Sequence, residues 1–136
     1  MGRPRRANEH VRTTAHASKV YAMCMRVPRG RVTTYGAIAK VLGTCPRAVG
    51  SALRRNPHAP HVPCHRVVAA SLQLGGFRGR WGSQHVDVQL KKAMLQREGV
   101  RFLDDRVLDR TYVVDERDEA FGAPLDVDVE GSEART

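Results

Sequence analysis

Residues 33–55 constrain the fold more than any other part of this chain, because they carry two short helical patterns around a tight turn. In the first pattern, apolar residues recur at helical spacing over residues 35–42. Thr33 or Thr34 is suited to cap the start of this helix, and Gly43 is suited to end it. The sequence therefore predicts a helix of about two turns here.

The second helical pattern follows after a brief turn. Thr44 can cap it and Pro46 suits its first turn. The helix continues over residues 47–55 and ends before Asn56-Pro57, because a residue that precedes proline disfavours the helical conformation. Two short helices joined by a tight turn predict a helix-turn-helix, which commonly places its second helix on DNA.

The whole domain is expected to be α+β and mostly helical, a winged-helix-like helix-turn-helix fold with short strands. An earlier helix is predicted to begin after Ser18 and to end at Pro28. Residues 65–68 are short and β-prone, and residues 75–82, rich in glycine and arginine, predict a flexible loop.

A further helix is predicted from an N-cap at Ser83 to Arg97, followed by Gly99 as its C-terminal glycine. We expect residues 102–103 and 112–114 to pair as a small hairpin. The residues that fall one turn apart in this helix, and so predict its packed face, are Val86, Leu90, Met94 and Arg97.

Charge is distributed very unevenly along the chain. Residues 1–103 hold 19 Lys and Arg against three acidic residues, a net +16, whereas residues 104–136 hold four Arg against eleven acidic residues, a net −7. A basic unit of this kind favours a polyanion as partner, and nucleic acid is the first candidate. The predicted organisation is a flexible basic arm over 1–17, one folded domain over 18–114, and an acidic, disordered tail over 115–136.

The 136 residues are about one domain's length, and the chain has only three cysteines. An odd and sparse cysteine set argues against a secreted disulfide scaffold, so an intracellular compartment is expected. The sequence has neither the apolar run of a membrane span nor a signal-peptide core, and we expect no membrane association.

Residues 63–67, Pro-Cys-His-Arg-Val, place a thiol beside an imidazole and a guanidinium. Cysteine is a good nucleophile only as the thiolate, and neighbouring cations favour that form. Cys64 is therefore the candidate nucleophile. Cys24 lies on an apolar helical stripe and is expected to be a packed core thiol, whereas Cys45 is expected to face solvent or the turn.

From Val20 to Gly99 the chain resembles the DNA-binding domain of the O6-alkylguanine-DNA alkyltransferases, which move an alkyl group from guanine O6 irreversibly onto their own cysteine. The motif at residues 63–67 is highly specific to that family and its close relatives. The further motifs that match in order are Gly30-Arg31-Val32-Thr33-Thr34-Tyr35, Arg47-Ala48-Val49-Gly50, Arg54-Arg55-Asn56-Pro57 and Arg97-Glu98-Gly99.

The resemblance implies a role for each of five residues. Cys64 would accept the alkyl group, His65 would act as its base through a water, and Glu98 would orient and stabilise the imidazole. Tyr35 would donate its phenol proton towards the guanine ring as the leaving oxygen gains charge. Asn56 would tie the recognition helix to the Cys64 turn. No cofactor and no metal are implied.

The resemblance also implies that the partner is double-stranded DNA containing O6-alkylguanine, bound by a monomer. The target base would be flipped out of the duplex, with Arg47 filling its place and the recognition helix in the minor groove. The residues implied to bind DNA are Thr34, Arg47, Ala48, Gly50, Ser51, Arg54 and Arg55. Those implied to surround the flipped base are Tyr35, Val67, Phe77 and Arg78.

The chain departs from the family at two points. Most members have an N-terminal domain before this one, whereas here about twenty residues precede the first predicted helix. Arg78 stands where family lids usually carry a serine, which changes the charge beside the alkyl pocket. We expect the protein to be located with the DNA, in the nucleus of a eukaryote or otherwise in the cytoplasm.

Two alternatives stay open from the sequence. The first is a non-catalytic alkyltransferase-like sensor, which flips the lesion and flags it for excision-repair proteins. Such proteins typically have tryptophan at the position of Cys64. The second is a zinc-stabilised DNA-binding module, in which His58, His61 and Cys64 would be ligands at tolerable spacing with Cys45 and His65 nearby. The absence of a C-x-x-C pair disfavours it.

Overall fold

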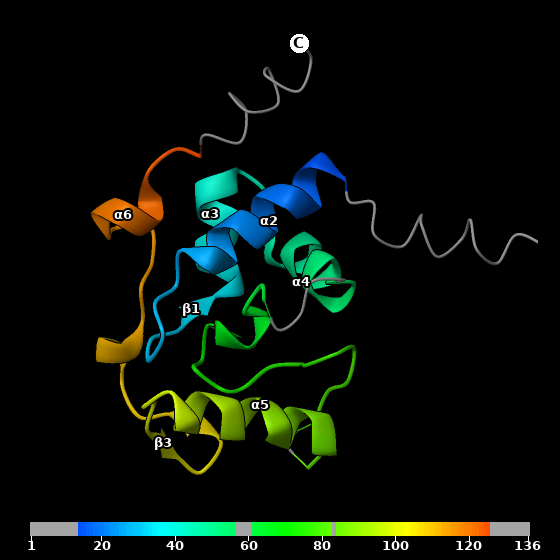
Figure 1. Ribbon diagram of the computed structural model, residues 1–136, viewed down its shortest axis with the longest axis vertical. Helices are drawn as coiled ribbons and strands as arrows, with labels where there is room; N and C mark the ends of the chain where they lie inside the picture. Colours follow the sequence, from blue (N-terminus) through cyan, green and yellow to red (C-terminus); the bar gives the residue numbers. More distant parts are fainter. Residues whose placement is uncertain (1–13, 57–60, 83, 126–136) are drawn as a thin grey trace, which may run out of the picture.

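The computed structural model describes residues 14–56, 61–82 and 84–125. Three helices pack together at one end of the molecule, and a fourth lies across the other end with a short pair of strands between (Figure 1). This is the expected α+β fold, mostly helical with short strands. The three packed helices are α2 (Ala15–Met25), α3 (Tyr35–Leu42) and α4 (Pro46–Arg54), and the fourth is α5 (Val86–Arg97).

The helix ends follow local capping chemistry, with two corrections to the sequence prediction. Thr14, rather than Ser18, caps α2, because its hydroxyl accepts a hydrogen bond from the Ala17 amide at 3.0 Å. Thr34 caps α3, and Gly43 ends that helix with φ = 73° as predicted. Cys45 rather than Thr44 precedes α4.

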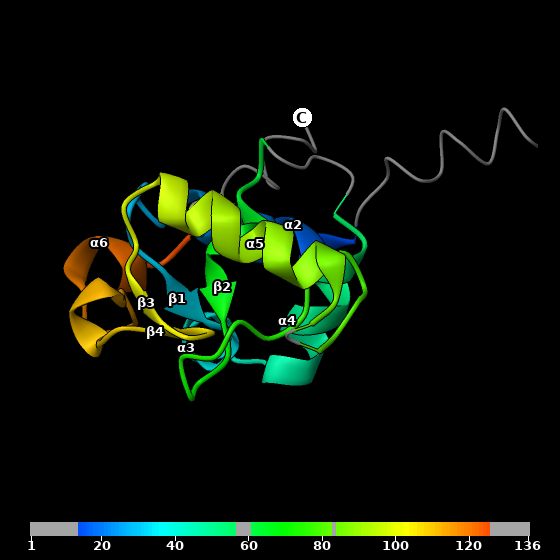
Figure 2. The ribbon, with the colours of Figure 1, turned by 90° about the horizontal axis from the view of Figure 1, so that it is seen from below.

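Two very short sheets connect distant parts of the chain. The strands β1 (Thr33–Thr34) and β2 (Val67–Val68) are parallel, and α5 crosses over them (Figure 2). The strands β3 (Phe102–Leu103) and β4 (Arg106–Val107) form an antiparallel hairpin.

The predicted hairpin between residues 102–103 and 112–114 was wrong, because residues 102–103 pair with β4. Tyr112 ends a 3-10 helix, η2 (Arg110–Tyr112), and Val113 forms a parallel bridge with Val32 beside β1. Both candidate partners are β-prone, so residue type could not choose between them. The observed partner, β4, begins six residues closer to β3 along the chain than the predicted one, which lets a tight turn close the hairpin.

The packed face of α5 also differs from the prediction. Val86 and Leu90 are 74% and 42% exposed, whereas Val88, Lys91 and Leu95 are completely buried. This face includes a lysine, so a search for apolar residues alone selected the wrong side of the helix. His85 is the N-cap of α5, and the predicted cap, Ser83, lies outside the described residues.

The acidic segment after Asp115 is folded as far as it is described, which corrects the prediction of a disordered tail. It forms a short helix, α6 (Glu119–Gly122), whose Phe121 is only 2% exposed. Phe121 joins the core formed by α2, α3 and α4. Arg26 donates a hydrogen bond to the Phe121 carbonyl at 2.9 Å and a second one to the Ala123 carbonyl. The remaining residues of the predicted tail, 126–136, and most of the predicted arm lie outside the described residues.

The described residues form two adjoining hydrophobic clusters. One joins α2, α3 and α4 with Phe121, and the other joins β2, α5 and β4. Cys24 is buried in the first cluster and Cys45 is exposed, as predicted. Among the described residues, no helix combines the length and the apolarity that crossing a membrane would require.

The buried position of Phe121 predicts a stability effect. We expect Phe121→Ala to lower the free energy of unfolding by about 3 kcal/mol, because it removes a buried aromatic ring and leaves a cavity. Urea unfolding followed by circular dichroism would measure this. Leu103, which is 62% exposed, is the matched control, and its alanine variant should change stability by no more than about 0.5 kcal/mol. Equal stability of the two variants would show that α6 contributes nothing to the core.

Candidate functional site

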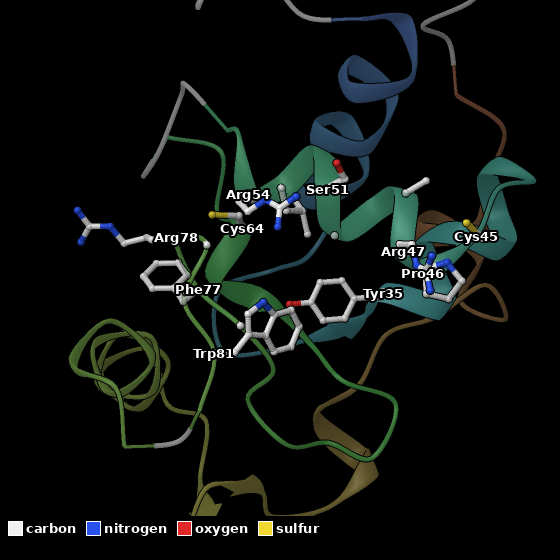
Figure 3. A pocket seen from close by; sticks show the side chains of 15 residues that line it. Tyr35, Cys45, Pro46, Arg47, Ser51, Arg54, Cys64, Phe77, Arg78 and Trp81 are labelled. Carbon is white, nitrogen blue, oxygen red and sulfur yellow. The ribbon is translucent and has the colours of Figure 1, made fainter.

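A cavity of about 690 Å³ lies between α4 and the loop over residues 76–81, and Cys64 opens onto it (Figure 3). It is lined by small and basic residues of α4 on one side and by aromatic and basic residues of the loop on the other. Its lining residues are Tyr35, Cys45, Pro46, Arg47, Ala48, Gly50, Ser51, Leu53, Arg54, Cys64, Gly76, Phe77, Arg78, Gly79 and Trp81.

Cys64 begins a single turn of 3-10 helix, η1 (Cys64–Arg66), and is partly exposed. Its amide donates a hydrogen bond to the Val62 carbonyl at 2.8 Å. The same carbonyl accepts a hydrogen bond from the side-chain amide of Asn56 at 3.2 Å. Asn56 follows α4, so its side chain joins the end of that helix to the turn that holds the thiol.

A carboxylate lies directly behind the Cys64 turn. Glu98, at the end of α5, is 9% exposed, and its Oε2 lies 2.9 Å from Nε2 of His65. Arg66 donates from Nε to Oε1 at 2.9 Å and from Nη2 to Oε2 at 3.0 Å. The carboxylate is therefore held by a two-point guanidinium contact and by the imidazole, and charge-assisted bonds of this kind are stronger than neutral ones.

The protonation states of this group follow from its contacts. Burial opposes ionisation of Glu98, but hydrogen bonds from Arg66 and His65 outweigh it and lower the pKa of that carboxyl. Burial also lowers the pKa of His65, although Glu98 acts in the opposite direction. His65 is thus neutral at pH 7. Because an ionised carboxylate only accepts, Nε2 carries the proton and Nδ1 is left as a base.

Tyr35, the first residue of α3, lies at the cavity and receives a hydrogen bond from the Gly76 backbone. Burial raises the pKa of its phenol to about 12, so the hydroxyl is protonated at neutral pH. A side chain at Gly75 would place its Cβ 3.1 Å from this hydroxyl. The glycine therefore allows the loop backbone to lie against the phenol.

Lys91 of α5 is completely buried beneath the same loop. Its ammonium donates to the carbonyls of Val67 at 2.6 Å, Leu74 at 2.5 Å and Gly76 at 3.0 Å, and it lies 5.9 Å from the centre of the Tyr35 ring. Burial lowers the pKa of Lys91 to about 7. The three carbonyl oxygens match the three donors of the ammonium form, so this side chain joins β2 to the cavity loop.

The tip of the loop is a tight two-residue turn. Phe77 and Arg80 exchange two backbone hydrogen bonds, of 2.8 and 2.9 Å. The central residues, Arg78 and Gly79, have φ of 56° and 81°, which is the pattern of the type I′ turn that matches the twist of a hairpin. Residues 75–82 therefore form a defined turn, where the sequence had indicated only a flexible loop.

Five of the seven residues implied to bind DNA line the cavity, namely Arg47, Ala48, Gly50, Ser51 and Arg54. Arg55 is exposed beside them and donates to the Ser51 hydroxyl at 2.9 Å. Thr34 is not a lining residue, and its hydroxyl caps α3.

Three of the four residues implied to surround the base also line the cavity, namely Tyr35, Phe77 and Arg78. Val67 does not, because its side chain is completely buried in the core and its carbonyl is bonded to Lys91. Arg78 lies 3.7 Å from Asp87.

Sequence reasoning missed three residues that shape this site. Arg66 pairs with Glu98, and its place next to His65 in the motif was the available signal. Trp81 lines the cavity, and a lone tryptophan in a glycine-rich loop was a signal as well. No signal in the sequence indicated Lys91, because a lysine on a helix normally indicates a solvated face.

The zinc alternative gains no support from the described residues, among which no group of three or more His, Cys, Asp or Glu side chains could hold a metal ion. His58, one of the candidate ligands, lies outside the part of the chain that the structure describes.

Residues 15–100 match the family described as 6-O-methylguanine DNA methyltransferase, DNA binding domain. A methylated-DNA–protein-cysteine methyltransferase of Saccharolobus islandicus is 44% identical over 93 residues, which cover 68% of this chain and 56% of that protein. The protein of the same name from Pyrobaculum aerophilum is 43% identical over 97 residues, 70% of this chain and 61% of that protein. The chain thus spans less than two thirds of the length of these relatives.

Solved structures show the same similarity. S. pombe Atl1 in complex with damaged DNA containing O6-carboxymethylguanine superposes with a TM-score of 0.62 and 27% identity, covering 76% of this chain and 98% of that one. Mycobacterium tuberculosis OGT in complex with DNA gives a TM-score of 0.56 and 37% identity, covering 64% of this chain and 51% of that one. The O6-methylguanine-DNA methyltransferase of Pyrococcus kodakaraensis gives a TM-score of 0.51 and 45% identity, covering 65% of this chain and 48% of that one.

The contacts of Lys91 predict that two adjacent lysines differ strongly in importance. We expect Lys91→Met to lower the free energy of unfolding by at least about 2 kcal/mol, because buried carbonyls lose their donor. Lys92→Met is the control. It removes a partly exposed 3.2 Å ion pair with Asp105, which is worth at most about 1 kcal/mol, and a contact of the ammonium with the Phe102 ring at 5.7 Å. Urea unfolding of both variants, with limited proteolysis of the 75–82 turn, would measure the difference. Equal losses would contradict the assigned role of Lys91.

Proposed function

The chain belongs to the 6-O-methylguanine DNA methyltransferase family through its DNA-binding domain, and on this premise we propose that it repairs alkylated DNA. It would transfer the alkyl group of O6-alkylguanine in duplex DNA irreversibly to its own Cys64. The observation that carries the proposal is a thiol open to a cavity, next to an imidazole that a buried carboxylate holds at 2.9 Å.

The chemical step requires a nucleophile, a base and a donor, and the cavity offers one of each. The Cys64 sulfur attacks the alkyl carbon, so a C–S bond forms while the bond from carbon to guanine O6 breaks. The thiol proton passes to Nδ1 of His65 through a water, and Glu98 stabilises the resulting imidazolium. The electron pair leaves with O6, and the protonated Tyr35 donates towards the ring. A thioether is a poor leaving group, so each molecule acts once.

The surface around the cavity suits DNA. Arg47 and Arg54 line the cavity from α4, and Arg55 is exposed beside them. None of the lining residues is acidic. Phosphate contacts of this kind give salt-dependent affinity. The small residues Ala48 and Gly50 of α4 let a flipped base pass close to the helix. The protein would act as a monomer.

The sensor alternative uses the same cavity without the chemistry. It would bind the lesion and recruit excision-repair proteins, so it needs no nucleophile. Cys64 with its His65–Glu98 pair favours transfer, because a sensor has no use for a base behind the thiol.

The first experiment incubates the protein with a duplex oligonucleotide that carries one O6-methylguanine and then analyses intact protein and peptides by mass spectrometry. We expect the Cys64 peptide to gain one methylene unit and the lesion to become guanine. Cys64→Ala protein should still bind the duplex but should show neither change. Cys45→Ala is the control for the second cysteine that lines the cavity, and this variant should still gain mass on Cys64. Tight binding of the lesion with no gain of mass would support the sensor instead.

The pH dependence of transfer tests the base. Because the pKa of His65 lies below its usual 6.5, protonation of the imidazole should lower the single-turnover rate only as the pH drops below 6.5. Glu98 raises the pKa of His65, so Glu98→Gln should move this fall to still lower pH. The same variant should reduce the maximal single-turnover rate, the plateau reached above this fall, at least about ten-fold, because the imidazolium loses its counter-charge.

The matched control for this pH profile is Arg29→Gln. Arg29 is 65% exposed and lies 4.0 Å from the same carboxylate, so its loss should change neither the plateau nor the midpoint. Urea unfolding would show that each variant is folded. A midpoint above 6.5 in the unmodified protein, or a Glu98→Gln profile identical to it, would contradict the role of His65 as base.

A further inference from the structure

Trp81 is the single tryptophan of the chain and lies at the cavity with 64% of its surface exposed. A large apolar ring is normally covered in a folded protein, so an exposed one at a concave site indicates a ligand surface. Neither the family resemblance nor the proposed chemistry assigns it a role.

The loop places the indole against the backbone of Gly76. The Phe77–Arg80 turn, closed by two backbone hydrogen bonds, leads directly into Trp81 and directs it back over Gly76. A Cβ at Gly76 would come within 2.6 Å of the indole ring, so this ring lies against bare backbone. One part of the ring is thus supported by Gly76, and the rest is exposed at the cavity.

Gly76 also determines which end of the cavity Trp81 occupies. Its backbone donates to the Tyr35 hydroxyl, and its carbonyl accepts from Lys91 at 3.0 Å. Trp81 and Tyr35 are therefore neighbours through a single residue, and Figure 3 shows the indole beside the phenol, away from the Cys64 sulfur. In the proposed reaction Cys64 meets the alkyl carbon and Tyr35 meets the purine ring. Trp81 consequently lies at the purine end.

We propose that Trp81 stacks on the purine ring of the flipped alkylguanine and so contributes to substrate binding whatever alkyl group is attached. The inference rests on the proposed function and adds a base-contacting residue to it. Stacking on an aromatic side chain needs only the flat face of the base and is insensitive to its substituents. An alkyl contact would behave differently, because its strength would grow with the size of the adduct.

The test compares duplexes that carry O6-methylguanine and O6-benzylguanine, with second-order transfer rates measured for each. Trp81→Leu should lower both rates about ten-fold and by the same factor, because the purine is common to both. Trp81→Phe keeps an aromatic ring and should restore most of the loss. Leu103→Ala, which removes another exposed apolar side chain far along the sequence, should leave both rates unchanged.

Fluorescence gives a second readout that does not depend on transfer. Since Trp81 is the single tryptophan, its emission in Cys64→Ala protein should change when a lesion duplex is added and should stay the same with an undamaged duplex of equal sequence. A loss of rate confined to the benzyl substrate would assign Trp81 to the alkyl group and overturn the proposal. Unchanged rates and unchanged emission would also overturn it.

Failure of this inference and failure of the proposed function are distinguishable. If unmodified protein gains mass on Cys64 while Trp81→Leu reacts at the same rate, the function stands and the stacking is wrong. If the protein gains no mass, the proposed transfer is wrong, and the emission change with lesion DNA still decides whether Trp81 contacts the base.

Discussion

The buried ammonium of Lys91 is the interaction on which the cavity depends. Desolvating a lysine is costly, and the cost is offset here because each of its three donors meets a backbone carbonyl. Those carbonyls belong to Val67 in β2, to Leu74 just before the loop and to Gly76 within it. One side chain thereby fixes the loop that faces α4 and keeps the Gly76 backbone against Tyr35. The buried side chains of Leu74 and Phe77 add apolar contacts to this polar connection.

In the second polar cluster, the Glu98 carboxylate contacts both Arg66 and His65, and the two contacts have different effects. The guanidinium supplies the charge that keeps the carboxylate ionised away from water, since Arg66 binds both oxygens. The imidazole is then free to act as a neutral base, because its pKa is lowered rather than raised overall. Glu98 alone would raise the pKa of His65 and would favour the imidazolium. Burial is the largest cause of the lowered pKa of His65, and the charge of Arg66 adds to it.

Local sequence predicted what local chemistry determines. The caps of α3, the proline at the start of α4 and the thiol-imidazole motif were all visible, because each depends on neighbours a few residues away. Prediction failed where a distant contact decides. Val113 pairs with Val32, and Phe121 is buried in the cluster formed by α2, α3 and α4. Lys91 is buried in a helix whose apolar residues indicated another face. The family resemblance supplied the pairing of His65 with Glu98, which spacing could not have supplied.

The pairing of β1 has a consequence for the order in which the protein is made. The Thr33 hydroxyl donates to the Val114 carbonyl at 2.7 Å across 81 positions of chain, whereas α3 and α4 are sequence neighbours that pack on each other. On the ribosome, the helix pair can fold early, but Cys64 emerges before α5 does. The His65 imidazole lacks its partner, the Glu98 carboxylate, until residue 98 has been synthesised. A nascent chain therefore carries a thiol without its His65–Glu98 pair until α5 has been made and has folded behind the Cys64 turn, and the contact between Thr33 and Val114 forms later still.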